Sequence, residues 1–380
     1  MNLKSRLPEL GTSIFAVMSR MALEHNAINL SQGFPDFQVD ETLLDLVSRF
    51  MREGNNQYAP MPGVPPLREV IAKVIEETYQ HKTDPETEIT ITAGGTEAIF
   101  ATIAALVSEG DQVIMFDPAY DCYDPAVRLN GGVPVHINLR YPKFSIDWNE
   151  VADKITEHTR VIMINTPHNP TGAVLSEQDM ITLQELADEH DLVVLSDEVY
   201  ERIIFDQKMH QSVLKYPGLA KRSVAVFSFG KTFHATGWKV GYAVAPVSIT
   251  REIRKAHQFI NFSVNTPVQM ALAEYMKEPG HYSHLGTFYQ QKRDYFLHQI
   301  QGSAFRVMAC HGSYFQLLSY DGLSDKPDLA MAEWLTKEHG LASIPVSVFY
   351  KDKTDHKLLR FCFAKGEETL SRAGNMLKRL

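Results

Sequence analysis

From residue 89 onward the sequence alternates between short apolar segments and longer segments with helical spacing. The short segments are rich in β-branched residues, and several are apolar at almost every position, as strands buried on both faces of a sheet are. Alternation of this kind predicts an α/β fold with a mostly parallel sheet flanked by helices. The seven expected strands are residues 89–92, 112–116, 133–139, 161–165, 192–196, 224–227 and 240–245.

The sequence on either side of this region is less regular. A chain of 380 residues exceeds one ordinary hydrophobic core, so more than one domain is expected. The pattern predicts a large seven-stranded domain over residues 39–270 and a smaller α+β domain over residues 271–380, with strands near 315–318 and 358–363. The N-terminal segment, residues 1–38, is expected to pack on the small domain.

Composition limits the kinds of partner that the protein can bind and the cellular compartment in which it is expected. A net charge of −9 argues against nucleic acid or an anionic membrane as the main partner. Cys122, Cys310 and Cys362 are widely spaced, which favours a reducing cytoplasm and argues against a zinc site, so no metal is expected. The first residues carry charge early and no long apolar run, so neither a signal peptide nor a membrane-spanning helix is expected.

Polar residues follow several of the expected strands. Ligands of parallel α/β sheets bind at the carboxyl ends of the strands. After the first strand, Gly94, Gly95 and Thr96 open a helix whose N-terminal amides suit a phosphate, although the same residues make an ordinary helix start. Tyr120 follows the second strand and places an aromatic ring at this edge, or else packs in the core.

The fourth and fifth strands are followed by an amide and a carboxylate. Asn169 lies in a stiff turn with two prolines, and neighbouring His168 has no partner at metal-ligand spacing. Asp197 directly follows an apolar strand, with Tyr200 three residues later. A carboxylate there is costly unless it faces a cation or hydrogen-bond donors, so Asp197 is expected to be functional.

A lysine follows the sixth strand. Lys231 lies among small and hydroxylated residues, three positions after Ser228, and Lys239 lies further on. Burial lowers the pKa of a lysine and makes its amine a nucleophile that can form a Schiff base with a carbonyl. From this segment alone, Lys231 could equally be a solvated loop residue.

Together these groups suit one cofactor. Pyridoxal phosphate needs amides and cations for its phosphate, a ring to stack on, a carboxylate for its pyridine nitrogen and an amine for its aldehyde. The chain resembles the class I/II aminotransferases of pyridoxal-phosphate fold type I, and most closely the branch of methionine aminotransferases and kynurenine–glutamine transaminases. The segments that carry the resemblance are residues 31–37, 57–60, 165–172, 197–200, 228–239 and 359–364.

The resemblance implies a role for each of these residues. The implied catalytic residues are Lys231, which forms the Schiff base, Asp197, which keeps the pyridine nitrogen protonated, and Tyr200. The resemblance further implies that Asn169 and Tyr200 bind the ring oxygen and that Tyr120 stacks on the ring. The implied phosphate site consists of Gly94, Gly95, Thr96, Ser228 and Lys239, the last where many relatives have arginine.

The resemblance also implies a homodimer and a substrate site. Tyr58 is expected to reach the phosphate of the neighbouring subunit, so that the active site lies at the subunit interface. Arg360 is expected to bind the substrate α-carboxylate through paired hydrogen bonds, with Asn169 and the Gly33 backbone. Phe15 is expected to contact the substrate.

The implied reaction is transfer of an amino group from an L-amino acid to a 2-oxo acid. No second arginine is evident for a distal carboxylate, and Phe15, Phe34, Tyr120 and Phe259 could form an aromatic pocket. These features favour methionine, aromatic amino acids, kynurenine or glutamine over aspartate. One alternative is a C–S β-lyase on the same fold, and another is a regulatory module that binds the cofactor without catalysis.

Overall fold

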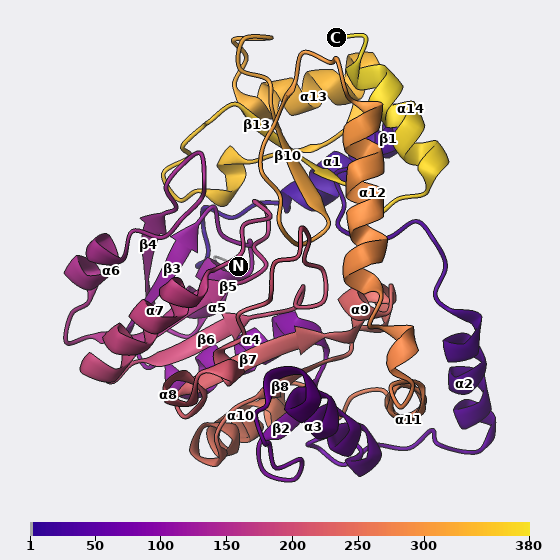
Figure 1. Cartoon of the computed structure of the whole chain (residues 1–380). Helices are drawn as coiled ribbons and strands as arrows, with labels where there is room; N and C mark the ends of the chain where they lie inside the picture. Colours follow the sequence, from indigo (N-terminus) through magenta and orange to yellow (C-terminus); the bar gives the residue numbers. More distant parts are fainter. Residues whose placement is uncertain (1–2) are drawn as a thin grey trace.

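The computed structural model describes residues 3–380. A large α/β part forms the lower half of the molecule in Figure 1, and a smaller part with its own sheet lies above it. The long helix α12 (Leu285–Gln299) runs along one side between the two parts. Within residues 3–380, no helix is both long and apolar enough to cross a membrane.

The large part is built on a seven-stranded sheet with the order β2-β8-β7-β6-β5-β3-β4. All seven expected strands are present, with ends within two residues of those predicted, so the α/β prediction is confirmed. The strands are β2 (Ile89–Thr92), β3 (Gln112–Asp117), β4 (Val133–Asn138), β5 (Thr159–Asn165), β6 (Val193–Asp197), β7 (Ser223–Ser228) and β8 (Gly241–Val244).

One strand, β8, runs against the others and makes the sheet mixed. It pairs antiparallel with β2 on one side and β7 on the other, whereas the remaining pairs are parallel. The connection from β7 to β8 holds only the short helices α9 (Phe229–Thr232) and η2 (Thr236–Trp238). Parallel strands need a long crossover, so a connection this compact returns the chain antiparallel.

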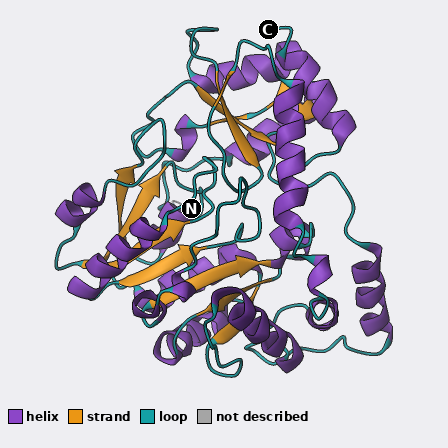
Figure 2. Cartoon of the chain, in the orientation of Figure 1, coloured by secondary structure: helices purple, strands orange, loops and turns teal. Residues whose placement is uncertain are grey.

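The sheet is buried on both faces, as its apolar strands require. Alternate residues of each strand enter two separate cores, shown in β5 by Ile162 and Ile164 in one and Val161 and Met163 in the other. Figure 2 shows helices on both sides of the sheet. One core includes α4 (Gly94–Leu106), α5 (Tyr123–Leu129) and α10 (Val247–Ile260). The other includes α3 (Pro65–Tyr79), α6 (Trp148–Lys154), α7 (Glu177–Glu189), η1 (Val213–Lys215) and α8 (Pro217–Ala220).

The smaller part contains an antiparallel sheet with the order β12-β13-β10-β9. Its strands are β9 (Arg306–Val307), β10 (Phe315–Ser319), β12 (Ile344–Pro345) and β13 (Leu358–Cys362). Its remaining helices are α13 (Asp328–His339), η4 (Ser347–Phe349) and α14 (Glu367–Leu377). This sheet places the start of β10 and the middle of β13 beside the large part.

The N-terminal segment joins the smaller part through a short parallel sheet. Helix α1 (Ile14–Glu24) leads to β1 (Ile28–Asn29), which pairs with β11 (Leu341–Ala342). The chain then crosses to the large part through α2 (Glu41–Arg52), which packs on α11 (Thr266–Tyr275), and η3 (Pro279–His281) leads back to α12. The domain boundaries at 38 and 270 stay predictions, and residue 270 lies inside α11.

A histidine between two carboxylates fixes the loop after β3. His136 on β4 contacts Asp117 through Nδ1 at 2.8 Å and Asp124 through Nε2 at 3.0 Å. Burial alone would lower the pKa of His136, but the two carboxylates raise it to about 9. Asp117 also accepts a hydrogen bond from the Lys351 backbone at 2.7 Å, so this cluster ties the large part to the smaller one.

We expect His136→Ala to lower the free energy of unfolding by roughly 3 kcal/mol at pH 6, because two carboxylates then lose their shared cation. The folded pKa lies above the value of about 6.5 for an unfolded histidine. The stabilisation is therefore complete below pH ~6.5 and is lost as the pH rises through about 9. Urea unfolding at several pH values measures this, with the exposed His158→Ala as control. An equal loss at pH 6 and pH 10 would contradict the prediction.

Candidate active site

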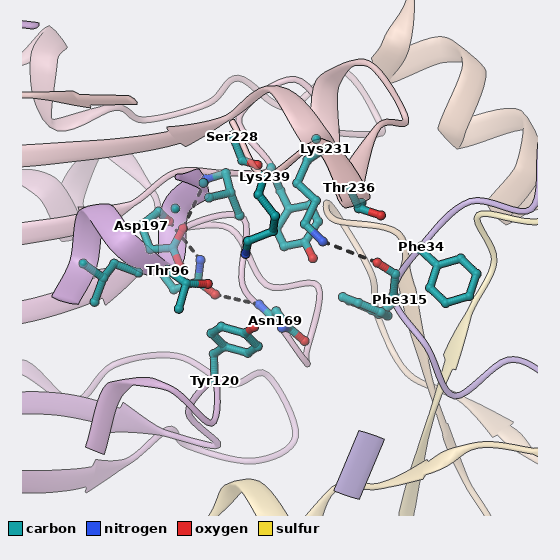
Figure 3. Close-up of a pocket in the computed structure, with 18 of the residues that line it drawn as sticks. Phe34, Thr96, Tyr120, Asn169, Asp197, Ser228, Lys231, Thr236, Lys239 and Phe315 are labelled. Carbon is teal, nitrogen blue, oxygen red and sulfur yellow. Dashed lines mark hydrogen bonds between the residues drawn. The ribbon is translucent and has the colours of Figure 1, made fainter. Parts of the chain in front are cut away.

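A pocket of about 270 Å³ lies where the sheet edge of the large part meets the smaller part and the N-terminal segment. Figure 3 shows Lys231 and Lys239 entering it from one stretch of chain, between Asp197 on one side and Phe34 and Phe315 on the other. Every catalytic, cofactor-binding and substrate-binding residue implied by the resemblance lines it except Tyr58. These residues are Phe15, Gly33, Gly94, Gly95, Thr96, Tyr120, Asn169, Asp197, Tyr200, Ser228, Lys231, Lys239 and Arg360.

One end of the pocket is the N-terminus of α4. Gly94 has a φ of +78°, which residues with a side chain rarely adopt, and a Cβ there would lie 3.4 Å from Lys239 Nζ. A Cβ on Gly95 would lie 3.0 Å from the Val199 side chain. No side chain of Ala93 caps this helix end. The helix terminus and the lysine together form a positive, close-fitting site suited to a phosphate.

The carboxylate at the end of β6 is almost completely buried. Asp197 is 4% exposed, and burial raises its pKa to about 6. The hydroxyl of Tyr123 donates to Asp197 Oδ2 at 2.6 Å, and the Val199 backbone donates to Oδ1 at 3.3 Å. These two donors oppose the effect of burial and favour the charged carboxylate of Asp197. A charged carboxylate is the form that would pair with the protonated pyridine nitrogen of pyridoxal phosphate.

The amine of Lys231 lies deep in the pocket. Lys231 lies on the short helix α9 and is only partly exposed. Burial lowers the pKa of Lys231 to about 8, so a substantial fraction of the amine is neutral near pH 8. Its Nζ donates to the hydroxyl of Tyr314 at 2.7 Å and to the carbonyl of Gly33 at 3.3 Å.

A buried arginine forms the opposite end of the pocket. Arg360 on β13 is 1% exposed, and its guanidinium stacks 3.9 Å from the ring centroid of Phe315. It donates to Asn169 Oδ1 and to the Ser31 carbonyl, each at 2.8 Å. Its Nε is buried and has no hydrogen-bond partner. Among the described residues no carboxylate forms a salt bridge with Arg360, so the charge at this end of the pocket favours an anionic ligand.

Sequence reasoning did not single out several residues of the site. Tyr123 is the first residue of α5, three positions after Tyr120, and the two rings pack edge-to-face with centroids 5.8 Å apart. Tyr314 and Phe315 come from the start of β10, and no local pattern marks that position as part of the site. Other lining residues outside the prediction are Gln32, Ile99, Asn165, Val199, Gly230, Thr236 and Val240.

Two aromatic residues named from the sequence lie outside this pocket. Tyr58 is 83% exposed and Phe259 is 85% exposed. Phe259 therefore does not form part of the pocket wall within its own chain, contrary to the expected aromatic set. Within residues 3–380, no group of three or more His, Cys, Asp or Glu side chains is arranged to hold a metal ion.

We expect Tyr123→Phe to raise the pKa of Asp197 above its value of about 6, because the carboxylate loses its hydroxyl donor while burial remains. Carbon-13 NMR of aspartate-labelled chain, without added ligand, follows the titration. Tyr289→Phe is the control, since the Tyr289 hydroxyl contacts His234 instead. An unchanged or lower midpoint in Tyr123→Phe would show that this hydrogen bond does not stabilise the carboxylate.

Known proteins share both the sequence and the structure. Residues 25–375 match the family model of aminotransferase class I and II. Methionine aminotransferase of Escherichia coli K12 is 50% identical over 99% of this chain and 98% of its own length. Kynurenine–oxoglutarate transaminase 1 of Rattus norvegicus is 33% identical over 98% and 97% of the two chains.

The solved structures agree with the sequence matches. The crystal structure of YbdL of Escherichia coli, identified as a methionine aminotransferase, superposes with a TM-score of 0.98 at 50% identity over the whole of both chains. Aspartate aminotransferase of Thermus thermophilus superposes with a TM-score of 0.91 at 28% identity, over 100% and 99% of the two chains. The chain therefore belongs to the class I and II aminotransferases, enzymes of fold type I that use pyridoxal phosphate.

Proposed function

We propose that the pocket around Lys231 is the site of amino transfer in this enzyme. The observation that carries the proposal is a lysine amine with a pKa of about 8 in the same pocket as the buried carboxylate of Asp197. The residues fit pyridoxal phosphate: the close-fitting glycines beside Lys239 suit its phosphate, and Asp197 suits its ring nitrogen. Tyr120, Asn169 and Tyr200 line the pocket between them.

Arg360 and Asn169 bind and orient the substrate in this proposal. The guanidinium lines the pocket and donates to Asn169 Oδ1, and each of its terminal nitrogens has a second N–H that can donate to the substrate α-carboxylate. The carboxylate fixes one end of the amino acid, and the α-carbon is directed towards Lys231. Burial of Arg360 against the Phe315 ring excludes water from this contact and strengthens it.

In this proposal Lys231 accepts and returns the α-proton of the amino-acid substrate. Bound pyridoxal phosphate supplies the electron sink that makes the α-hydrogen of the substrate acidic. The neutral amine of Lys231 takes that proton and later returns it, as a general base and acid with a pKa of about 8. Asp197, with Tyr123 as its hydrogen-bond donor, would keep the cofactor's ring nitrogen protonated.

The proposed amino donor has an uncharged side chain, with methionine first and aromatic amino acids, kynurenine and glutamine next. Phe15, Phe34, Tyr120 and Phe315 give the pocket aromatic walls. Among the described residues that line it, Arg360 is the one arginine, which leaves none for a second carboxylate. The Escherichia coli methionine aminotransferase, at 50% identity, supports methionine in particular.

We further propose that the enzyme acts as a homodimer in the cytoplasm. An exposed apolar patch consists of Tyr58, Phe259, Ile260 and Phe262, with Tyr58 and Phe262 in edge-to-face contact at 5.5 Å. Exposed aromatic groups of this extent favour burial against another protein surface. A second copy would cover the patch and bring its Tyr58 towards the phosphate site. Three free cysteines support a reducing compartment.

We expect the enzyme with pyridoxal phosphate to convert methionine and a 2-oxo acid into one equivalent each of the new oxo acid and amino acid. Aspartate should be at least about tenfold slower, because its second carboxylate meets apolar walls. Lys231→Ala should lose turnover, while the exposed Lys255→Ala should keep it. Assays that follow both products across a donor panel test this. Turnover in Lys231→Ala would overturn the proposal, and so would pyruvate and ammonia formed without an acceptor from a cystathionine-like donor in place of amino transfer.

We expect Phe259→Asp and Phe262→Asp to give monomers with little activity, because each places a charge in the proposed interface. Sedimentation velocity and the methionine assay measure the two effects. Leu329→Asp is the control, an apolar residue on α13 whose exposure of 43% matches the 44% of Phe262. A fully active monomeric wild-type enzyme would contradict the dimer proposal but not the chemistry.

A further inference from the structure

The free amine of Lys231 has a defined place in this structure, and the contacts that hold it come from the N-terminal segment and the smaller part. Its two hydrogen-bond partners are the Tyr314 hydroxyl, at 2.7 Å, and the Gly33 carbonyl, at 3.3 Å. Tyr314 immediately precedes β10, and Gly33 follows β1. In the proposed function, the group that takes the substrate α-proton is a free lysine amine of this kind.

The directions of these hydrogen bonds decide what the amine can do. Tyr314 donates its own proton to the Gly33 carbonyl, so its oxygen is an acceptor towards Lys231. The carbonyl is an acceptor as well. A neutral amine has two N–H groups and one lone pair. Both N–H groups are used by these two acceptors, and the lone pair is left without a competing donor from either partner.

Tyr314 is held firmly enough to define this geometry. It is completely buried and packs edge-to-face on Tyr200, with ring centroids 5.0 Å apart. Its ring also contacts Phe315 at 4.9 Å and Tyr289 at 5.8 Å. A hydroxyl fixed by ring packing on three sides can orient a flexible lysine, since few of its own rotations remain free.

We propose that Tyr314 is a positioning residue for proton transfer: its hydroxyl and the Gly33 carbonyl hold the released amine of Lys231 with the lone pair free for the substrate α-proton. In this step the α C–H bond breaks, its electrons stay with the substrate and bound cofactor, and the proton forms a new N–H bond on Lys231. The proposal rests on the proposed function of Lys231 and adds a residue that the sequence did not indicate.

Tyr314→Phe removes the hydroxyl and keeps the ring, so the packing around it is retained. We expect a slower amino-acid half-reaction, by roughly tenfold to a hundredfold, as for loss of one hydrogen bond to a charged or reacting group. Because proton transfer becomes more rate-limiting, the isotope effect with α-deuterated methionine should increase. Tyr289→Phe is the matched control, a buried tyrosine of the same cluster whose hydroxyl contacts His234 Nδ1 at 2.9 Å.

A second measurement uses the chain without cofactor. The two acceptors stabilise the ammonium form more than the neutral amine, so Tyr314→Phe should lower the pKa of Lys231, measured from the pH dependence of its rate of acylation. A half-reaction within twofold of wild type, or a slower one with an unchanged isotope effect and unchanged pKa, would overturn the proposal. Loss of activity in Lys231→Ala alongside a normal Tyr314→Phe would leave the proposed function intact. Turnover in Lys231→Ala would contradict both the proposed function of Lys231 and the positioning role of Tyr314.

Discussion

A buried guanidinium determines how the three parts of this chain can come together. Arg360 cannot lose its charge, and it is placed where almost no water reaches it, so its donors need acceptors from the protein. Asn169, from the loop after β5, supplies one acceptor, and the Ser31 carbonyl of the N-terminal segment supplies another. Only an arrangement that brings both acceptors to β13 gives the buried guanidinium its hydrogen-bond partners. The pocket is the space that this arrangement leaves open, with Arg360 in its wall.

Burial acts on the two central ionisable groups in opposite directions. It lowers the pKa of Lys231 to about 8 and raises that of Asp197 to about 6, in each case by disfavouring the charged form. The same exclusion of water therefore makes the lysine more nucleophilic and the carboxylate more dependent on its donors. An active site of this kind reduces the stability of the empty protein, and a bound ligand with complementary charges restores it.

The parts of the fold that local pattern determines were predictable from the sequence. Strands such as β5 are buried on both faces and therefore read as continuous apolar segments, and the residues that follow them lie at one edge by the geometry of a parallel sheet. The reversal of β8 depends on the conformation of its connection to β7, which holds only the short helices α9 and η2 and which the apolar pattern does not reveal. Tyr123 and Tyr314 belong to the site through tertiary contacts alone. Strands β9, β11 and β12 have two residues each, too few to show a period.

The reversed strand β8 has a consequence for how the enzyme can diversify. Ser228 pairs with Gly241, so the segment that carries both Lys231 and Lys239 begins and ends on neighbouring strands joined by sheet hydrogen bonds. The spacing of the two lysines is therefore a local property of one closed loop and does not depend on how the smaller part sits over the pocket. If the two lysines hold the aldehyde and the phosphate of one small ring, that ring is positioned by a single piece of backbone. The aromatic walls that contact the rest of the substrate lie on other elements, and they can change without moving the reacting groups.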